Sequence, residues 1–303
     1  MTDLSIIVIS YNTKVLTEKC LETIISSLHH KSTITAEIIV IDNNSNDGSV
    51  EMLKDFHSSM LMSQSPNIKL KTIFSKSNLG YAKGNNEAVK RAEGKIILFL
   101  NSDIEVLADA IPKLYQFFVN QKRFQFIGGK LFNQDMTSQA SCGPDYSLPI
   151  VFTALFLRGD YYGLTRYSPN QLRQVDWVSG ACFICKKTDF ENISGFDNNI
   201  FMYMDEIDLF FRARKHQLIV GFYPDAQFIH IGSGSSHGRT QPILQVFKGL
   251  IYFYKKHHRT SAINFLKFML KLKALVACRI GRLLGNQYLI STYAKAYKIV
   301  DNN

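Results

Sequence analysis

The sequence has few of the features that mark secreted or membrane-spanning proteins. Its five cysteines show no disulfide framework, and Cys182 and Cys185 lack the second pair that a structural zinc site needs. Residues three apart on a strand also face opposite ways, so both thiols are predicted to lie in the core. The chain opens with no basic segment and cleavage site, and no uncharged run of about 18 apolar residues occurs. We therefore expect neither a signal peptide nor a spanning helix.

Acidic residues are scarce in one part of the chain only. From Ser236 onward lie 12 of the 35 Lys and Arg residues but only one of the 25 Asp and Glu residues, Asp301. The residues before Ser236 carry 23 basic and 24 acidic side chains and are nearly neutral. A neutral body with a basic end predicts a surface for anionic lipid or nucleic acid at that end. The hydrophobic content of 46% is sufficient for a sizeable core.

The first hundred residues alternate between short apolar runs and helical patterns. This alternation predicts a parallel sheet, whose most apolar strand ends at Asn101-Ser102-Asp103. Each strand is followed by a polar loop, and such loops gather at the edge where open α/β sheets bind ligands. The predicted strands are Ser5–Ser10, Glu37–Ile41, Ile68–Phe74 and Ile96–Leu100.

The pattern is less regular after Asp103. The segment Tyr161–Gln174 is polar, aromatic and irregular, and we interpret it as a mobile lid. Small residues at Ser179-Gly180-Ala181 allow a backbone or ligand to approach closely. Asp208 and Arg212 are spaced as an i,i+4 ion pair on a helix. We expect helices at Ala110–Val119 and Met204–His216, a loop-rich stretch at Asn133–Pro149, and strands at Phe126–Phe132, Trp177–Cys185 and Gln227–Ile231.

Five polar blocks between Ser5 and Ser236 resemble, in order and spacing, glycosyltransferase family 2 and its rhamnosyltransferase-like branch. Each block alone is a weak signal, whereas all five in this order are specific. The blocks are Ile9-Ser10-Tyr11-Asn12, Asp42-Asn43-x-Ser45-x-Asp47-Gly48, Asn78-x-Gly80-x-Ala82-x-Gly84-Asn85-Asn86, Leu100-Asn101-Ser102-Asp103 and Phe201-x-Tyr203-x-Asp205-Glu206-x-Asp208-Leu209.

The resemblance implies the GT-A fold, an α/β fold with a Rossmann-like, mostly parallel central sheet and flanking helices. Residues 1–240 would form the catalytic domain, with a nucleotide-sugar-binding half at 1–103 and an acceptor-binding half at 104–240. Residues 241–303 would form a basic, amphipathic helical region that associates with a membrane. The implied activity is inverting transfer of a sugar from a nucleoside-diphosphate donor to a hydroxyl group.

The resemblance also assigns the donor and metal sites. It places the nucleobase and ribose near Ser10, Tyr11, Asn12, Asp42 and Asn44, and the diphosphate beside Asn78, Gly80, Lys83, Asn85, Asn101 and Ser102. Asp103 matches the last Asp of the family's D-x-D motif, a metal ligand, whereas Asn101 replaces the first. His230 matches a family histidine that can complete the metal site, although a histidine that ends a strand also has an ordinary structural explanation. The implied cofactor is a divalent cation, Mg²⁺ or Mn²⁺, which neutralises charge on the leaving diphosphate.

The last block implies the catalytic base. The family's Glu-Asp pair is exchanged to Asp205-Glu206, and the position of the base falls on Glu206. One carboxylate must accept the proton of the acceptor hydroxyl as its oxygen attacks the anomeric carbon. Asp205 has an alternative explanation as a negative charge favoured at the start of a helix. If the alignment is shifted by one residue, Asp205 is the base.

Alternative activities are distinguished by particular residues. Gly234-Ser235-Ser236-His237-Gly238 fits a hydrolase nucleophile elbow, but no acid followed by a histidine lies downstream, so we reject that interpretation. A sugar nucleotidyltransferase would carry a Gly-rich, basic loop after the first strand, and Tyr11-Asn12-Thr13-Lys14 is not one. Asn101 and the exchanged Asp205-Glu206 leave open a non-catalytic nucleotide-sugar-binding protein. The acidic residues near the expected site argue against nucleic acid as a partner.

The C-terminal region has the pattern of a helix that lies in a membrane interface. In Ile263–Ile280, apolar residues recur at helical spacing and Lys267 and Lys271 fall opposite them. Lys273 and Arg279 lie at the edges of the stripe, where their side chains can snorkel. An ordinary packed helix, or a homo-oligomer interface, is the alternative. The predicted stripe consists of Phe265, Phe268, Met269, Leu272, Leu275 and Val276.

These expectations combine into one hypothesis. The chain would transfer a sugar from a UDP- or dTDP-sugar, with dTDP-rhamnose one candidate, to a lipid-linked glycan in bacterial surface polysaccharide synthesis. It would act in the cytoplasm, as a peripheral protein on the inner face of the cell membrane.

Overall fold

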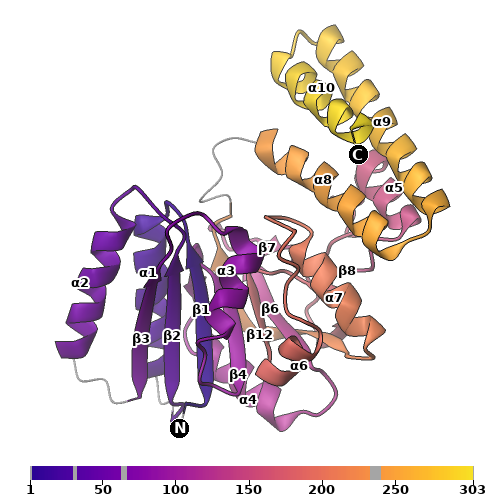
Figure 1. Cartoon of the computed structure of the whole chain (residues 1–303). Coiled ribbons are helices and arrows are strands. Elements are labelled where there is room, and N and C mark those ends of the chain that lie inside the picture. Colours follow the sequence, from indigo (N-terminus) through magenta and orange to yellow (C-terminus); the bar gives the residue numbers. More distant parts are fainter. Residues whose placement is uncertain (1, 30–32, 63–66, 233–239, 303) are drawn as a thin grey trace.

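The N-terminal half is a parallel sheet, as predicted. The computed structural model describes residues 2–29, 33–62, 67–232 and 240–302. The strands β1, β2, β3 and β4 pair in the order β3-β2-β1-β4, all parallel and without register shifts (Figure 1). The elements are β1 (Leu4–Ser10), α1 (Lys14–His29), β2 (Ala36–Asp42), α2 (Ser49–Met62), β3 (Ile68–Phe74), α3 (Gly80–Val89) and β4 (Ile96–Asn101).

The second half continues the same sheet with antiparallel and mixed pairing. β11 lies between β4 and β6 and is antiparallel to both. β12 is parallel to β6 and antiparallel to β5, which is the last strand of the order. The elements are β5 (Ile104–Val106), α4 (Ala110–Asn120), β6 (Phe126–Phe132), β7 (Ser138–Gln139), β8 (Cys142–Gly143), α5 (Leu148–Phe156), β9 (Arg173–Val175), β10 (Trp177–Val178), β11 (Cys182–Lys186), α6 (Lys187–Asn192), α7 (Asp205–Lys215) and β12 (Val220–His230).

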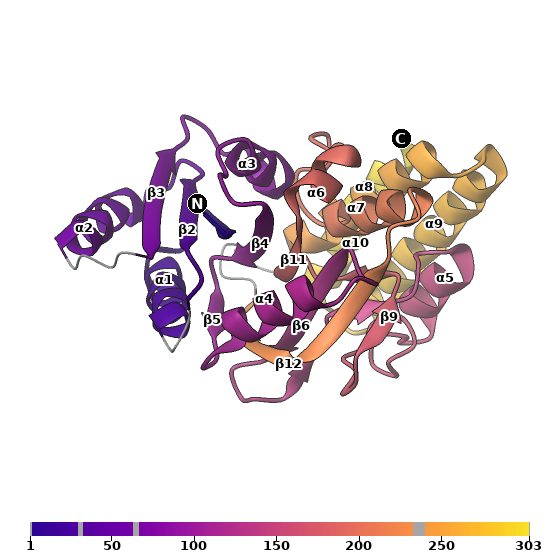
Figure 2. The same cartoon turned by 90° about the horizontal axis from the view of Figure 1, so that it is seen from below.

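Helices cover both faces of this sheet, which accounts for the unbroken apolar strands. One core lies between the sheet and α3, α6 and α7, and the other lies between the sheet and α1 and α4 (Figure 2). Neighbouring residues on a strand alternate between the two cores, as Ile7 and Val8 do on β1. A strand that is buried on both faces appears in the sequence as a continuous hydrophobic run, and such runs are what predicted these strands.

Several boundaries differ from those predicted. The strand expected at Trp177–Cys185 is divided into β10 and β11, because the chain turns at Ser179-Gly180-Ala181. β12 begins at Val220, seven residues before the expected start, since its first half pairs with β6 and β9. The short strands β7 and β8 lie in the stretch predicted to be loop. Cys182 and Cys185 are buried in the two cores, as predicted.

The C-terminal residues form three helices that pack on the body and on α5. They are α8 (Thr240–His257), α9 (Thr260–Leu283) and α10 (Gln287–Asp301) (Figure 1). α8 places Phe253 and Tyr254, both fully buried, in the core that also contains α7. The division at residue 240 remains a prediction. None of the helices in the described ranges has the length and apolarity required to cross a bilayer.

The apolar stripe predicted on α9 was partly wrong. Met269 is buried with Leu266 and Leu270, whereas the other five residues of the stripe are 39–60% exposed. α9 is therefore apolar on two faces, one packed and one open. Lys273 does not point to the edge of the stripe, because its Nζ donates to the carbonyl of Leu155 at the end of α5, 2.6 Å away.

Candidate active site

A cavity of about 290 Å³ opens at the carboxyl ends of β1 and β4. It lies between the parallel half of the sheet, the start of α3 and the start of α7. Nine of the residues singled out from the sequence line it: Tyr11, Asn78, Gly80, Asn101, Ser102, Asp103, Asp205, Glu206 and His230. Segments separated by more than 200 residues thus meet here, because the parallel topology brings these strand ends to one edge.

The other six predicted residues lie outside the described wall of the cavity. Two of them shape the loops behind the wall. Asn12 Oδ1 accepts a hydrogen bond from Asn46 N (2.8 Å), which joins the loops after β1 and β2, and Asp42 Oδ1 accepts one from Ser45 N (2.9 Å) within the loop after β2. The six residues are Ser10, Asn12, Asp42, Asn44, Lys83 and Asn85, of which Lys83 is exposed and Ser10, Asp42 and Asn85 are buried.

Asp103 and His230 form one end of the cavity. His230 Nε2 lies 3.4 Å from Asp103 Oδ1 and 3.3 Å from Asn101 Nδ2. His230 Nδ1 lies 2.7 Å from Gln139 Oε1, which can only accept, so Nδ1 donates to Gln139 and Nε2 faces Asp103. A histidine oriented in this way by its second nitrogen is typical of a metal ligand. No group of three or more His, Cys, Asp or Glu side chains suited to a metal occurs in the described residues, so further ligands would come from substrate and water.

Asp205 and Glu206 enter the cavity from the first turn of α7. The two residues before them, Tyr203 (φ 62°) and Met204 (φ 67°), have left-handed backbone conformations that are unfavourable for non-glycine residues. The helix α8 packs closely against this turn: a Cβ on Gly249 would meet Met204 Cγ at 2.8 Å. The strained turn is therefore held in place by α8, and it aims both carboxyl groups at the cavity.

The surroundings of the two carboxyl groups affect their pKa values differently. Burial raises the pKa of Asp205 well above its usual range, and the neighbouring Glu206 carboxylate raises it further. Burial also raises the pKa of Glu206, but its hydrogen bond with Asp205 and the positive charge of Arg166 both lower that pKa. Asp205 is therefore the member of the pair that retains the proton, and Glu206 is the member that ionises first. An ionised carboxylate beside the cavity can accept a proton.

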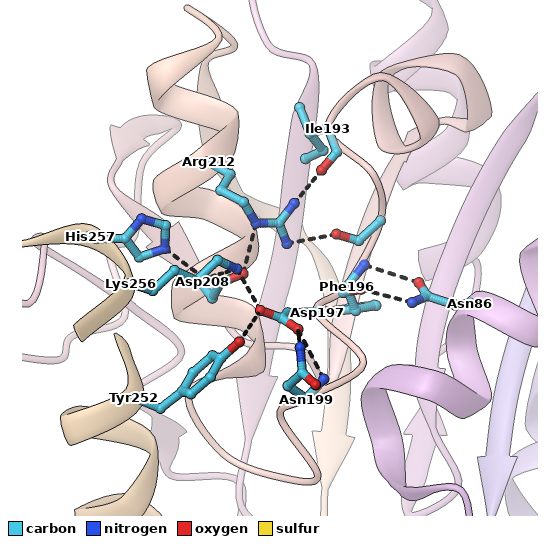
Figure 3. Close-up of polar contacts among 11 residues, drawn as sticks. Asn86, Ile193, Phe196, Asp197, Asn199, Asp208, Arg212, Tyr252, Lys256 and His257 are labelled. Carbon is cyan, nitrogen blue, oxygen red and sulfur yellow. Dashed lines mark hydrogen bonds and ion pairs between the residues drawn. The ribbon is translucent and has the colours of Figure 1, made fainter. Parts of the chain in front are cut away.

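Asp208, one turn further along α7, anchors the start of this helix to α8. Its carboxylate accepts from Arg212 Nε (2.7 Å), as the sequence predicted, and also from Lys256 Nζ (2.8 Å) and His257 Nε2 (2.7 Å) (Figure 3). These donors hold the pKa of Asp208 far below its usual range, against the effect of burial. Lys256 also bonds Asp197, which accepts from Tyr252 OH at 2.8 Å. The network fixes α7 and α8 relative to each other.

Sequence reasoning missed several residues of the cavity wall. Tyr81 OH donates to the carbonyl of Gly180 at 2.6 Å and so joins α3 to the turn between β10 and β11. Asn43, Thr13 and Arg166 also line the cavity. Arg166 belongs to the segment interpreted as a lid, where the neighbouring Tyr167 forms a bridge to Cys142 of β8. The signal for Asn43 was its place in the second polar block, whereas nothing in the local sequence marked Arg166. The elbow motif Gly234–Gly238 lies outside the described residues.

Comparisons with known proteins identify the family of this chain. The model of the family described as Glycosyl transferase family 2 matches residues 5–208. The low-salt glycan biosynthesis hexosyltransferase Agl10 of Haloferax volcanii is 26% identical over 76% of this chain and 67% of its own length. The rhamnosyltransferase WbbL of Escherichia coli K12 is 30% identical over 50% of this chain and 60% of its own length, so the match spans less than two thirds of that relative.

A solved structure shows the same fold. The mannosyltransferase PcManGT of Pyrobaculum calidifontis, in complex with GDP-Man and Mn²⁺, is 14% identical and superposes with a TM-score of 0.56, covering 97% of this chain and 73% of that one. This likeness supports the GT-A fold of mixed α/β layers. With the family model matching two thirds of its residues, this chain belongs to glycosyltransferase family 2.

Proposed function

We propose that this protein is an inverting glycosyltransferase that transfers a sugar from a UDP- or dTDP-sugar, with dTDP-rhamnose one candidate, to a hydroxyl of a glycan. One observation carries the proposal: a single cavity has Asp103 and His230 in its wall together with the ionisable pair Asp205 and Glu206. The first pair suits a diphosphate held through a cation, and the second suits proton uptake. Family membership and the hexosyl- and rhamnosyltransferase relatives support the same reaction class.

Glu206 accepts the proton in this mechanism. The acceptor oxygen attacks the anomeric carbon as the diphosphate departs from the opposite side, which inverts the configuration. As the hydroxyl loses its proton, the Glu206 carboxylate takes it up. Asp205, protonated, donates its hydrogen bond to Glu206 and keeps that carboxylate ionised and oriented. The buried position of the pair raises the basicity of Glu206 above that of a solvated carboxylate.

The end formed by Asp103 and His230 fits a divalent cation, Mg²⁺ or Mn²⁺. Asp103 supplies a carboxylate oxygen and His230 an imidazole lone pair, and Gln139 fixes the ring. Such a cation would neutralise the negative charge that develops on the leaving diphosphate. The Mn²⁺ in the structure of PcManGT supports this assignment. Asn101, where a second carboxylate would stand, lies beside His230 and can donate a hydrogen bond to the diphosphate.

Nucleotide binding would use the neighbouring wall. Tyr11, Thr13, Asn43 and Asn78 line the cavity next to the loops after β1, β2 and β3. Asp42 Oδ2 and Asn43 Oδ1 are buried and have no hydrogen-bond partner among the described residues. Buried acceptors without partners are costly, and the hydroxyls of a ribose would satisfy them.

The test of this proposal is nucleoside-diphosphate release. Purified protein is incubated with UDP- and dTDP-sugars and Mn²⁺, and released UDP or dTDP is measured with and without glycan acceptors. We expect release from one donor that depends on the divalent cation. A nucleotide-sugar-binding protein without activity would bind the donor and release nothing. A nucleotidyltransferase would instead form pyrophosphate from a nucleoside triphosphate and a sugar phosphate, and either result would overturn the proposal.

We also propose that the protein acts as a peripheral protein on the inner face of the cell membrane, where it meets a lipid-linked acceptor in surface polysaccharide synthesis. The outer face of α9 supports this location. It exposes Phe265, Phe268 and Leu275 by 50%, 60% and 47%, in a region that carries 12 basic residues and one acid. An exposed apolar stripe flanked by cations inserts into an interface and is attracted by anionic lipid. A second copy of the chain is the alternative occupant of this stripe.

Co-sedimentation with liposomes tests the location. The double variant Phe268→Ser and Leu275→Ser should bind vesicles containing phosphatidylglycerol at least several-fold more weakly than the wild type, and high salt should release part of the wild-type protein. Point substitutions are preferable to truncation because α8 contributes to the core. The control is Val119→Ser, which removes another exposed apolar side chain, from α4. Equal binding by all three proteins, or a wild-type dimer that the double variant abolishes, would contradict the proposal.

A further inference from the structure

Gly249 lies in the interior of α8, where this helix passes close to the turn before Asp205. A Cβ at this position would meet Met204 Cγ at 2.8 Å, Met204 Cβ at 3.0 Å and the carbonyl oxygen of Tyr203 at 3.3 Å. The last two atoms lie on or next to the main chain and cannot rotate away. Glycine is unfavourable for helix formation inside a helix. Its presence here allows α8 to approach the turn more closely than a helix with a side chain could.

The same face of α8 holds the chain on both sides of that turn. Gly249, Tyr252 and Lys256 are spaced i, i+3 and i+7, which places them on one side of the helix. Tyr252 OH and Lys256 Nζ donate to Asp197, before the turn, at 2.8 and 2.6 Å (Figure 3). Lys256 Nζ also donates to Asp208, after the turn, at 2.8 Å. One stripe of α8 thus contacts the chain before the turn, at the turn and after it.

Phe201, in the same loop, is attached to α3. Tyr81 N donates to the carbonyl of Phe201 at 3.0 Å, and a Cβ on Gly80 would meet that carbonyl oxygen at 2.6 Å. This contact joins the loop to the wall that we assign to the donor diphosphate. α8 contacts the loop three residues later, at Met204, directly before the two carboxyl groups. A shift of Met204 would therefore move these carboxyl groups more than the nucleotide wall.

We propose that the Gly249 face of α8 positions Glu206 for proton uptake, with Gly249 as the positioning residue at the point of contact. This inference rests on the proposed transferase function. Tyr203 and Met204 have left-handed backbone conformations, which such residues keep only where the surrounding structure imposes them. α8 packs against both, and so fixes the direction in which the Glu206 carboxylate leaves the turn. The match to the family model ends at residue 208, whereas α8 begins at 240, so the C-terminal part of the chain supplies this role.

Gly249→Ala tests this role when turnover and affinity are measured together. Release of nucleotide from the UDP- or dTDP-sugar that the wild type uses gives kcat and KM, and calorimetry with Mn²⁺ gives the affinity for UDP or dTDP. The added methyl group must displace the turn by several tenths of an ångström. Because a misplacement of 1 Å can cost about 100-fold in rate, we expect kcat to fall about 10-fold and nucleotide affinity to change less than about 2-fold.

A second substitution in the turn should remove this effect. Met204→Gly deletes the Cβ and Cγ that the new methyl group would meet, and glycine readily adopts the left-handed conformation of this position. In the Met204→Gly background, Gly249→Ala should therefore change kcat less than about 3-fold. If Gly249 served only the packing of α8, Gly249→Ala would lower the melting temperature and leave kcat at the wild-type value in both backgrounds.

Gly281→Ala is the matched control. Gly281 lies on α9, and a Cβ there would meet Ile290 Cγ1 and Leu289 Cβ of α10, both at 3.0 Å. The contact is as tight as that of Gly249 with Met204 Cβ, but it joins two C-terminal helices and does not involve the turn. Gly281→Ala should lower the melting temperature and leave kcat and nucleotide affinity unchanged.

Lys256→Met is an independent perturbation of the same face of α8. It removes the hydrogen bonds to Asp197 and Asp208 and leaves the contact of Gly249 unchanged, and it should also lower kcat several-fold without loss of UDP or dTDP affinity. Wild-type kcat in folded Gly249→Ala would overturn the inference, as would a loss of nucleotide affinity equal to the loss of kcat. If Gly249→Ala does not fold, wild-type kcat in Lys256→Met overturns it. Failure of the proposed function itself appears in the wild type, as absent nucleotide release from every UDP- and dTDP-sugar.

Discussion

Replacing Asp208 by asparagine should lower the stability more than the loss of a surface ion pair would. The reason is that Asp208 is a buried anion with three cationic or hydrogen-bonding partners. Its side chain is fully buried and accepts hydrogen bonds from Arg212, Lys256 and His257. An asparagine at this position would keep the size of the side chain, lose the charge, and replace one acceptor oxygen by a donor that faces other donors. Arg212 would then lack a carboxylate that offsets its own desolvation, and Lys256 would keep only that of Asp197.

The expected loss is about 3 kcal/mol. Removing one partner of a buried ion pair costs about 3–5 kcal/mol, and the lower end applies because both cations keep other acceptors. Lys256 retains Asp197 at 2.6 Å, and Arg212 retains the carbonyls of Ile193 and Gly195. With an unfolding entropy of about 2.1 cal/mol/K per residue, a chain of 303 residues should melt about 5 °C lower.

The loss should also depend on pH. Because the pKa of Asp208 is lowered on folding, its contribution to stability is fully present above the unfolded pKa, about 3.9, and is lost as the pH falls toward the folded pKa. The difference in melting temperature between wild type and Asp208→Asn should therefore be constant from pH 7 to about pH 5 and become smaller below about pH 4.

Thermal unfolding followed by circular dichroism at pH 7, 5 and 3.5 measures this difference. The control is Asp109→Asn, which removes an exposed i,i+4 pair with Lys113 and should cost well under 1 kcal/mol. If Asp208→Asn melts no lower than this control at pH 7, or if the difference persists unchanged at pH 3.5, the account of the network is wrong.

Three further predictions concern the cavity. Asp103→Asn should abolish the Mn²⁺-dependent part of UDP or dTDP binding in calorimetry, whereas unchanged titration curves would exclude Asp103 as a ligand. His230→Ala should weaken the same binding less, because the carboxylate carries the charge, and an effect larger than that of Asp103→Asn would reverse this assignment. Since burial raises the pKa of Glu206, the fall of kcat/KM toward low pH should begin at a higher pH than for a solvated glutamate. Because the Arg166 charge lowers the pKa of Glu206, Arg166→Gln should move this acidic limb of the pH profile to still higher pH. An acidic limb that does not move would show that Arg166 does not act on Glu206.

The parallel half of the fold and much of the cavity could be predicted from the sequence because both depend on local signals. Apolar runs define β1, β2 and β4, and each predicted residue of the cavity wall from Tyr11 to Asp103 ends a strand, lies in the loop after a strand or starts a helix. Once the sheet is parallel, these residues must meet at one edge. The Asp208–Arg212 pair was predictable for the same reason, since helical spacing alone places the two side chains together.

Other features depend on contacts across the chain that leave no local pattern. Lys256 and His257 reach Asp208 over about 50 residues, and their role appears only when α8 packs on α7. Arg166 lines the cavity because its loop is held by the bridge between Cys142 and Tyr167. The error at Met269 has a similar cause: α9 is apolar on two faces, and periodicity does not show which of them is packed.

The transfer reaction of Glu206→Gln compared with Asp205→Asn tests the central claim most directly. With the donor identified by nucleotide release, turnover and nucleotide affinity are measured for both variants. We predict that Glu206→Gln lowers turnover by at least about 10²-fold with little change in UDP or dTDP affinity, because the glutamine keeps the shape and cannot accept the proton. Turnover of Glu206→Gln close to wild type, with Asp205→Asn inactive, would contradict the assignment of Glu206 as the base.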